Sequence, residues 1–524
     1  MLIALIFFLF LLSGAISLVL KKQGIRTAYI WMMLVFISLI LWLLLLVFPK
    51  DRISPLIISN WFRFGDTVIS LRFAITSRNW ILAISLLAFN LAFFLTGVAR
   101  LNVKTDLQYW IFQLVLIALS FLAVLSADLW LVVLFWTALD LLDLVFHWMI
   151  NKGIGGNTYF QKIIFKFLGS MLLIWNIAAL SGSGFNPLID GLVASTSNTS
   201  LFLAAFLHSG IFPLKTKPGN NSEGESGKLL KSAFRVINFV VSFSLVISLP
   251  APELPLLISF FIRLISYFII ITSMIQWVSN KDLEVSLKFL LIGEAGVFIF
   301  LYFSGVTQYI TYRLALITLS VLWLVLFTHR GKNLVVFPVI NIFFASGLPL
   351  SLIAFGPRGF IGSEFSPGLV VLIVMQVLFF LGYLKHAFEK NEEFNDLEVW
   401  YQAAYLAGLF FPLLSITAII INSMPSLESE IQYWWVGAIV ATLASIGFYY
   451  AERNKFFNKS PQYTSAARMV WLWKFLTFEW FFKTISFIKD KIGNFINGFS
   501  GLLEGEGGVL WALVLLLLIL TVIK

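Results

Sequence analysis

Cysteine is absent from this chain of 524 residues, and histidine occurs only four times. The lack of cysteine excludes disulfide bonds, iron–sulfur clusters, haem–thiolate sites and thiolate zinc sites. Four scattered histidines also argue against a histidine-rich metal centre. We therefore expect the chain itself to hold no metal and no cofactor.

Charge is scarce as well, because only 12% of the residues are Asp, Glu, Lys or Arg and 60% are hydrophobic. A soluble globular protein is about half apolar and about a quarter charged. The composition predicts an all-α membrane protein that crosses the bilayer many times. The net charge of +10 does not indicate nucleic-acid binding, since Lys and Arg gather in the cytoplasmic loops of membrane proteins.

Motifs for nucleotide binding and hydrolysis are also missing. The phosphate-loop pattern Gly-x-x-x-x-Gly-Lys-Ser/Thr does not occur, and no order of Ser, His and Asp suggests a hydrolase. We therefore expect no catalysis from this chain alone, although a redox-driven translocase could contain it as a subunit.

Apolar windows of about 20 residues, the length that a helix needs to cross a bilayer, recur along the whole sequence. They predict about sixteen transmembrane segments. The predicted segments are 1–20, 27–49, 79–98, 107–125, 127–149, 159–182, 200–214, 227–249, 254–278, 285–303, 309–328, 334–355, 367–385, 401–421, 432–450 and 508–523. Before the last of them, residues 462–507 carry too many charges to cross a membrane and predict an amphipathic lateral helix at its surface.

Loops rich in Lys and Arg alternate along the chain with loops that are poor in them. KKQGIR, at residues 21–26, directly follows the first segment, which lacks the positive region and cleavage site of a removed signal peptide. Since basic loops face the cytoplasm, we expect a multi-pass protein of the cell's inner (cytoplasmic) membrane. Its N-terminus would lie outside and its lateral helix on the cytoplasmic side. The alternating sequence WFRFGDTVISLRF, at 61–73, predicts a short hairpin on the outer surface.

Ionisable residues within the apolar segments are candidates for the functional site, because charge at membrane depth is costly and usually marks an ion path. Asp140 and Asp143 are three residues apart in the fifth segment, so they share one face of a helix. A buried carboxylate can accept protons near neutral pH. The simpler interpretation is that the pair lies at a water-filled surface or makes a structural contact with a lysine.

Four further residues extend this candidate path. His208, in the seventh segment, can carry a proton at physiological pH or hydrogen-bond a neighbouring helix as a neutral group. Lys231 opens the eighth segment, where it either relays protons or extends to the cytoplasm. Glu294 lies about ten residues into the tenth segment, near the middle of the bilayer. Arg313 opens the eleventh segment and stays protonated, so it can pair with a carboxylate but is a poor proton carrier.

Two helix breaks are predicted where proline and glycine interrupt apolar segments. In FLHSGIFPLKTKPG, at 206–219, Pro213 ends the seventh segment where basic residues begin. Gly347 and Pro349 interrupt the twelfth segment in ASGLPLS. Non-helical backbone at membrane depth is tolerated where it is buried or lines a cavity, which is typical of transporters.

These motifs, in this order, resemble the antiporter-like family of membrane subunits. Its members are the large proton-pumping subunits of respiratory complex I, their relatives in membrane-bound hydrogenases and Mrp antiporters, and the membrane subunit of an inorganic-carbon uptake system. LSADLWLVVLFWTALDLL resembles the family's fifth helix, and HSGIFPLKT resembles its broken seventh helix. LLKSAFRV, SNKDLEVSLKFLLIGEAG, YRLALITL and ASGLPLS resemble later segments in the same order. The resemblance covers nearly the whole chain.

The ionisable residues depart from the family's usual set. Thr137 stands where the family has a key Glu, with Asp140 one turn on as a substitute. His208 stands at the lysine of the seventh helix, and Lys231 at the histidine of the eighth. Arg313 falls at the central lysine of the eleventh segment.

The resemblance implies a proton- or cation-translocating subunit of a larger complex related to respiratory complex I or Mrp. Its mid-membrane path would contain Asp140, Asp143, His208, Lys231 and Glu294, with Arg313 tuning it electrostatically. The alternatives are a structural scaffold that no longer pumps and the membrane subunit of a proton-driven inorganic-carbon uptake complex. Expected partners are the lipid bilayer, other membrane subunits and a soluble redox or zinc-containing subunit, but no nucleic acid.

The resemblance also implies six parts, with two inverted repeats at the centre. They are 1–106, the N-terminal helices with the outer hairpin; 107–249 and 250–388, two antiporter-like half-channels; 389–461, further transmembrane helices; 462–507, the lateral helix; and 508–524, the final helix.

Overall fold

The computed structural model describes residues 2–48, 55–64, 67–100, 107–151, 157–182, 188–189, 192, 197–212, 225–252, 254–330, 332–352, 367–388, 392–394, 397–423, 434–453 and 491. Contacts divide the chain into two units, Met1–Phe212 with Thr216–Pro461, and Pro213–Lys215 with Gln462–Lys524. All described residues except Lys491 belong to the first unit. The expected lateral helix, apart from Lys491, and the expected final segment lie outside the described residues.

Twelve helices in the described part are long and apolar enough to cross a membrane, so the chain is a multi-pass α-helical membrane protein. Helices suit this environment because they satisfy their backbone hydrogen bonds internally. They are α1 (Leu2–Lys22), α2 (Thr27–Val47), α3 (Ser77–Gly97), α4 (Leu107–Leu125), α5 (Leu129–Asn151), α6 (Asn157–Gly182), α8 (Glu225–Ser248), α9 (Leu256–Ser279), α10 (Leu283–Phe303), α11 (Gln308–Leu316) continued by the π-helical η4 (Ile317–Val321) and α12 (Leu322–Leu326), α14 (Pro367–Phe388) and α15 (Val399–Ser423). Each coincides with a predicted segment, and the total of about sixteen stays a prediction.

Three further predicted segments contain helices outside these twelve. They are α7 (Ser197–His208), α13 (Val336–Ala345) and α16 (Trp434–Arg453), of which Trp435–Tyr450 is the apolar part. Gly210 follows α7 with φ 73°, and Gly347 follows α13 with φ 80°. This left-handed backbone favours glycine and ends both helices early. Pro213 lies outside the described residues, whereas Pro349 directly precedes Leu350, which has φ 67°.

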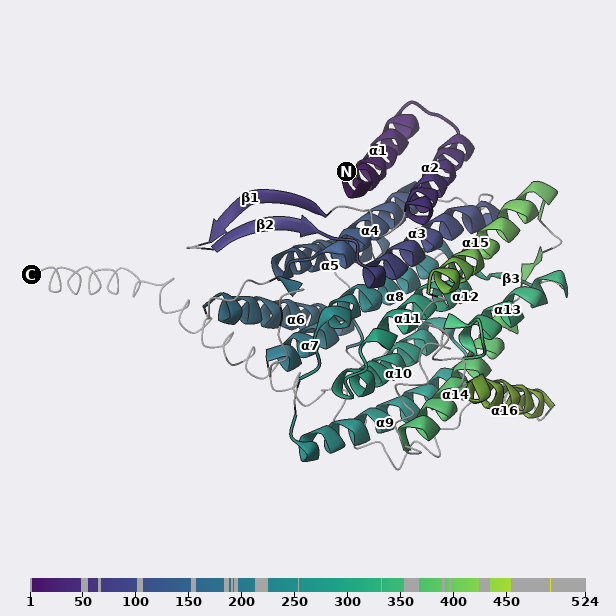
Figure 1. The fold of residues 1–524 in the computed structure, drawn as a ribbon. Helices are drawn as coiled ribbons and strands as arrows, with labels where there is room; N and C mark the ends of the chain where they lie inside the picture. The colour runs from purple at the N-terminus through teal and green to yellow at the C-terminus, as the bar shows by residue number, and fades with distance from the viewer. Residues whose placement is uncertain are drawn as a thin grey trace, which may run out of the picture. The chain divides into compact units, whose positions relative to one another are not determined.

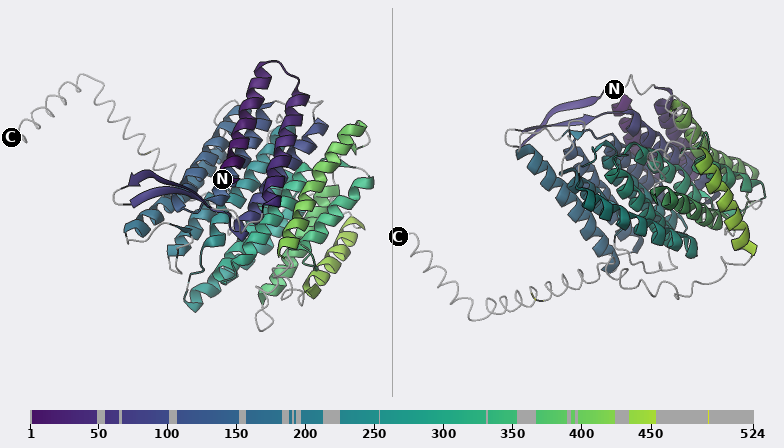
Figure 2. Two further views of the ribbon diagram at one scale, coloured as in Figure 1. Left: turned by 45° about the horizontal axis from the view of Figure 1, so that its top comes forward. Right: turned by 60° about the horizontal axis from the view of Figure 1, so that its bottom comes forward.

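The helices run side by side around two central members, α3 and α8 (Figures 1 and 2). Nearly all residues of α3 are buried, and α2, α4, α11 and α15 pack against it. Helix α8 contacts α4, α5, α7, α10, α11 and α12, so it packs against helices that precede it in the chain and helices that follow it. The remaining short elements are η2 (Val98–Arg100), η5 (Lys332–Val335), β3 (His329–Arg330) and β4 (Glu392–Glu393).

Tryptophan side chains tie the helices together by hydrogen bonds. Trp31 Nε1 donates to the Phe94 carbonyl at 2.6 Å, and Trp323 Nε1 donates to the Leu409 carbonyl at 3.0 Å. Such bonds matter in lipid, where apolar burial drives helix association only weakly.

The predicted hairpin is present as β1 (Leu56–Phe64) and β2 (Thr67–Phe73), which pair antiparallel. The turn between α4 and α5 extends this sheet, because Ala127 N donates to the Arg72 carbonyl at 2.9 Å. Asp128, the next residue, bridges to Leu188 and caps α5 by accepting the Trp130 N–H at 2.9 Å.

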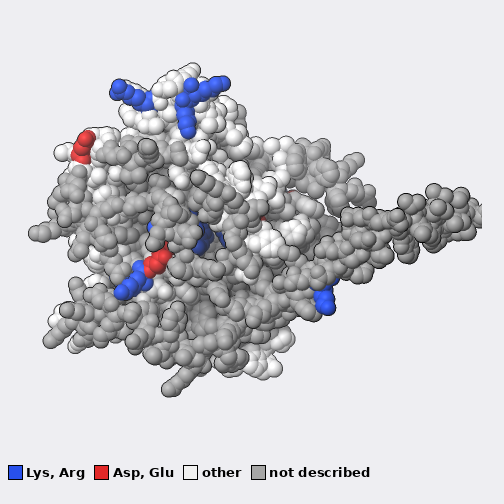
Figure 3. Space-filling model, turned by 180° about the vertical axis from the view of Figure 1, so that it is seen from behind, with Lys and Arg blue, Asp and Glu red and all other residues white. Residues whose placement is uncertain are grey.

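Charged side chains are few on the described surface seen in Figure 3, as expected of a protein that faces lipid.

Asp128 makes the stability of the fold depend on pH. Burial raises the pKa of this carboxyl group from 3.8 to about 6, and the hydrogen bond from Trp130 only partly opposes the shift. A raised carboxyl pKa means that the folded state binds the proton more tightly, so stability is lost as pH rises from about 4 to about 6. The Asp128→Asn variant keeps the helix cap but removes the charge. We expect its thermal unfolding midpoint to exceed that of the native protein at pH 7 and to equal it near pH 4. If the thermal unfolding midpoint of the detergent-solubilised variant depended on pH in the same way as that of the native protein, the prediction would be contradicted.

Gly437 of α16 provides a second test of the fold, because it touches the backbone of the second helix break. A Cβ at this position would lie 2.5 Å from the Leu348 nitrogen, whereas one at Gly447 of the same helix would meet only Leu381, at 3.4 Å. We expect Gly437→Ala to lower the free energy of unfolding by about 1–3 kcal/mol through overpacking. Gly447→Ala should be neutral or stabilise by up to about 1 kcal/mol. Thermal unfolding of the two variants in one detergent compares them, and equal midpoints would contradict the prediction.

Candidate functional site

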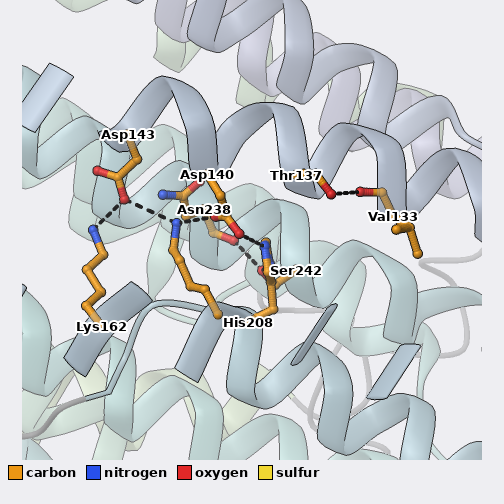
Figure 4. Close-up of polar contacts among 9 residues, drawn as sticks. Val133, Thr137, Asp140, Asp143, Lys162, His208, Asn238 and Ser242 are labelled. Atoms are coloured by element: carbon orange, nitrogen blue, oxygen red, sulfur yellow. Dashed lines mark hydrogen bonds and ion pairs between the residues drawn. The ribbon is translucent and has the colours of Figure 1, made fainter. Parts of the chain in front are cut away.

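Two aspartates on α5 and two lysines on α6 form a buried group of charges (Figure 4). Lys162 Nζ lies 2.7 Å from Asp143 Oδ2. Lys166 Nζ lies 2.7 Å from Asp140 Oδ1 and 3.2 Å from Asp143 Oδ2, so it bridges both carboxylates. Spacings of three and four residues place each pair on one face of its helix, and the two faces meet.

His208 joins this group from the last residue of α7. Its Nε2 lies 3.2 Å from Asp140 Oδ2, and its Nδ1 lies 2.7 Å from the Ser242 hydroxyl on α8. The indole of Trp136 stacks on the imidazole, with ring centroids 4.0 Å apart and 6° between the planes. Both edges and one face of the buried ring are therefore fixed.

The hydrogen bonds around His208 require a proton between its Nε2 and Asp140. The Ser242 hydroxyl can donate to the Asn238 carbonyl at 2.7 Å or to His208 Nδ1 at 2.7 Å. When it donates to Nδ1, a neutral imidazole carries its hydrogen on Nε2 and donates to Asp140. When it donates to Asn238, it accepts from Nδ1, and His208 is protonated on both nitrogens.

Two glycines allow α7 to end against α6. A Cβ on Gly169 would lie 2.7 Å from the His208 nitrogen and 2.8 Å from the Ala204 carbonyl oxygen, so only glycine fits without displacing α7. Gly210 turns the chain directly after α7 and lies beside the Lys166 side chain. These contacts bring His208 to the charges of α5 and α6.

Lys162 and Lys166 are missing from the residues that the sequence analysis predicts for the site. They lie one turn apart in YFQKIIFKFL, inside an apolar segment where a lysine is costly. The same argument that selects Asp140 and Asp143 applies to them, so the signal was present in the sequence.

Lys231 lies in a second group, formed by the first three turns of α8 and the first turn of α10. Its Nζ is 3.1 Å from Glu284 Oε1, and an Arg235 nitrogen is 3.3 Å from the same oxygen. Arg235 also donates to the Glu284 carbonyl at 2.5 Å. The structure thus places the predicted Lys231 beside an acid that the sequence analysis left out of the path.

A polar face of α8 connects the two groups. Its residues, at spacings of four, three and four positions, are Lys231, Arg235, Asn238 and Ser242. These spacings place the side chains along one side of a helix. The buried Asn238 amide has no hydrogen-bond partner among the described residues. Arg235 is also within electrostatic range of Lys162 on α6.

Glu294 and Arg313, both predicted for the path, form a separate ion pair between α10 and α11. Arg313 donates from Nε to Glu294 Oε2 at 2.9 Å and from a terminal nitrogen to Oε1 at 2.8 Å. The side chains are 1% and 5% exposed. The same terminal nitrogen lies 3.3 Å from the sulfur of Met375 on α14. No hydrogen bond of this pair within the described residues reaches His208.

The Asp140 group, defined as Asp140, Asp143, Lys162, Lys166 and His208, combines a buried centre with two partly exposed ends. The side chains of Lys166 and His208 are 3% and 0% exposed, whereas those of Asp140 and Lys162 are 25% and 22% exposed. Such an arrangement can take up and pass on protons. Within the described part of the chain, no set of three or more His, Asp or Glu is arranged to hold a metal ion.

No protein-family model and no curated protein sequence matches the chain. Solved structures of membrane complexes do match. A chain of the Mrp complex from Dietzia sp. aligns with TM-score 0.64 and 13% identity over 100% of this chain. This chain has the fold of an antiporter-like membrane subunit. It spans 63% of the length of that Mrp chain.

Two respiratory complexes contain similar chains. A chain of the membrane-bound sulfane sulfur reductase, an archaeal respiratory membrane complex, aligns with TM-score 0.56 and 14% identity over 84% of this chain and 99% of its own length. A chain of respiratory complex I from Thermus thermophilus aligns with TM-score 0.54 and 14% identity over 80% of this chain and 97% of its own. The antiporter-like fold that the motifs predicted is confirmed.

Lys166 is expected to be essential for the stability of the site. Lys166→Met removes the cation between two buried carboxylates, which should lower the free energy of unfolding by about 3–5 kcal/mol. Lys228→Met, on the exposed side of α8, serves as the control and should stay within about 0.5 kcal/mol of native. Denaturant unfolding of both detergent-solubilised variants measures the difference. Equal values for the two variants would contradict the prediction.

Proposed function

We propose that this chain is a proton-translocating subunit of a multisubunit membrane complex. The observation that carries the proposal is the Asp140 group, in which side chains from three helices bury their charges at the end of a broken helix. Ionisable groups persist at membrane depth where they serve an ion path. The fold shared with chains of Mrp and respiratory complexes supports the same assignment.

The chemistry of the group favours a proton over a metal cation. Each carboxylate oxygen of Asp140 already faces a nitrogen, Oδ1 that of Lys166 and Oδ2 that of His208. Hard metal cations need several oxygen ligands, and ammonium groups cannot act as ligands. A metal cation would have to displace Lys166, whereas a proton needs no new ligand. Translocation of a metal cation is therefore the less favoured form of this proposal.

A shift of Lys166 would couple the two carboxylates during proton transfer. When a His208 protonated on both nitrogens passes its Nε2 proton to Asp140, the imidazole becomes neutral, and Asp140 loses its negative charge and attracts Lys166 less. Asp143, whose Oδ2 is 3.2 Å from Lys166 Nζ, then offers the nearest remaining charge. The Lys166 ammonium would then move toward Asp143, and it would move back after Asp140 releases its proton. Because Asp143 also pairs with Lys162, this movement would alter the electrostatic environment of Lys162.

The polar face of α8 would provide the connection to one side of the membrane. Asn238 lies between the hydroxyl of Ser242 and the charges of Arg235, and its free amide can bind water on such a route. Lys231 and Glu284 would form the end of this route. The basic turn at 21–26 supports an N-terminus outside and these residues on the cytoplasmic side.

We further propose the inner membrane as the location, with other membrane subunits as partners and a soluble redox subunit as the source of energy. The two half-channels at 107–249 and 250–388 are part of this proposal. A scaffold that does not pump is the second candidate, because Arg313 holds Glu294 in a dry pair where the family has a titratable lysine.

Asp140 is expected to be indispensable for transport, and Thr137, one turn earlier on α5, provides the matched control. The Thr137 hydroxyl donates to the Val133 carbonyl of its own helix at 2.7 Å and turns away from the Asp140 group (Figure 4). In proteoliposomes containing the complex, Asp140→Asn should lower proton flux by at least about ten-fold, because the acceptor is lost. Thr137→Val should leave flux unchanged. Native flux in Asp140→Asn would contradict the proposed function.

A further inference from the structure

Two ion pairs occupy matching places in two similar runs of helices. In each run a helix with an ion-paired acid is followed by a helix with its basic partner, then by a short helix that ends before a glycine with positive φ, then by a long helix. Asp140 and Lys166 form the pair in the first run, and Glu294 and Arg313 form it in the second. Because the setting is similar, chemical differences between the pairs indicate different roles.

The first pair is arranged for exchange. Lys166 has two carboxylates within 3.2 Å and can favour either one. Asp140 has an alternative proton donor in His208, and its side chain is 25% exposed. Each member of the pair therefore has a second partner when the first bond breaks.

The second pair has neither property. Both carboxylate oxygens of Glu294 accept hydrogen bonds from one guanidinium, and the two side chains are 1% and 5% exposed. Arginine stays protonated at every physiological pH. A proton arriving at Glu294 would break two charge-assisted bonds and leave the Arg313 cation buried without its counter-ion. The terminal nitrogen that donates to Glu294 Oε1 also contacts the thioether of Met375, which carries no proton.

The helix break of the second run is also held by groups that do not titrate. Ser320 of η4 donates to the Asn341 side-chain oxygen on α13 at 2.6 Å. Gln376 of α14 donates to the Ala345 carbonyl at the end of α13, also at 2.6 Å. In the first run, by contrast, the last residue of the broken helix is the titratable His208.

We infer that Glu294 and Arg313 form a permanent ionic lock, which holds α10 against α11 and carries no proton. Proton exchange is then confined to the Asp140 group in the first run. This inference rests on the proposed function, and it changes the role expected for Glu294 from a member of the path to a structural anchor.

The test replaces the whole pair in the complex with apolar side chains. The double variant Glu294→Leu with Arg313→Met should unfold at about the native midpoint and keep flux within about two-fold of native, because an apolar pair can replace a buried ion pair. The single Glu294→Leu leaves a buried cation and should unfold at a lower temperature. The matched double variant of the first run, Asp140→Leu with Lys166→Met, should lose at least about ten-fold in flux.

The outcome that overturns the lock is a folded Glu294→Leu, Arg313→Met complex whose flux falls by about ten-fold or more. Infrared spectroscopy of the native complex, with the Glu294 band assigned from the Glu294→Gln variant, gives a readout that needs no transport. The band of an ionised Glu294 carboxylate in the complex supports the lock, and the band of a protonated carboxyl overturns it. Native flux no higher than that of Asp140→Asn would instead refute the proposed function, and the infrared result would still decide the lock.

Discussion

The contact of Lys166 with two carboxylates is the interaction on which the candidate site depends. An unpaired ammonium or carboxylate inside a membrane protein costs several kcal/mol, so neither α5 nor α6 could bury its charges alone. Sharing one cation between Asp140 and Asp143 leaves room for a further donor, and His208 takes that place at the end of α7. Stability and the proposed proton exchange therefore depend on the same atoms.

The packing around the site follows from the weak apolar driving force between helices in lipid. Close helix contact at Gly169 and hydrogen bonds between helices, such as that from Trp323 to a neighbouring carbonyl, provide the stabilisation that apolar burial does not. Helix α8 also contacts charged groups at two places, because Ser242 binds His208 and Lys231 pairs with Glu284. The shape of the bundle thus decides which ionisable groups can meet.

Much of the fold could be predicted because length and hydropathy determine where a helix can cross a membrane. The hairpin near residue 61 and the interruption at Gly347 also followed from local patterns of alternation and of glycine with proline. The site was predicted less completely. Asp140 and His208 were identified from the cost of burying them, but Lys162 and Lys166 meet the same criterion and were left out. Glu294 and Arg313 were placed in one path with His208, whereas they bond to each other.

The sequence by itself determined that this is a helical membrane protein with charges at membrane depth and with helices interrupted at glycine. These features depend on local composition and spacing, which can be read from the sequence without knowing which segments pack together. Only the tertiary structure decided the pairing of those charges. The choice of partner depends on which helix faces lie within about 3 Å of each other, and residues 26 or 19 positions apart in the chain meet only after the helices pack.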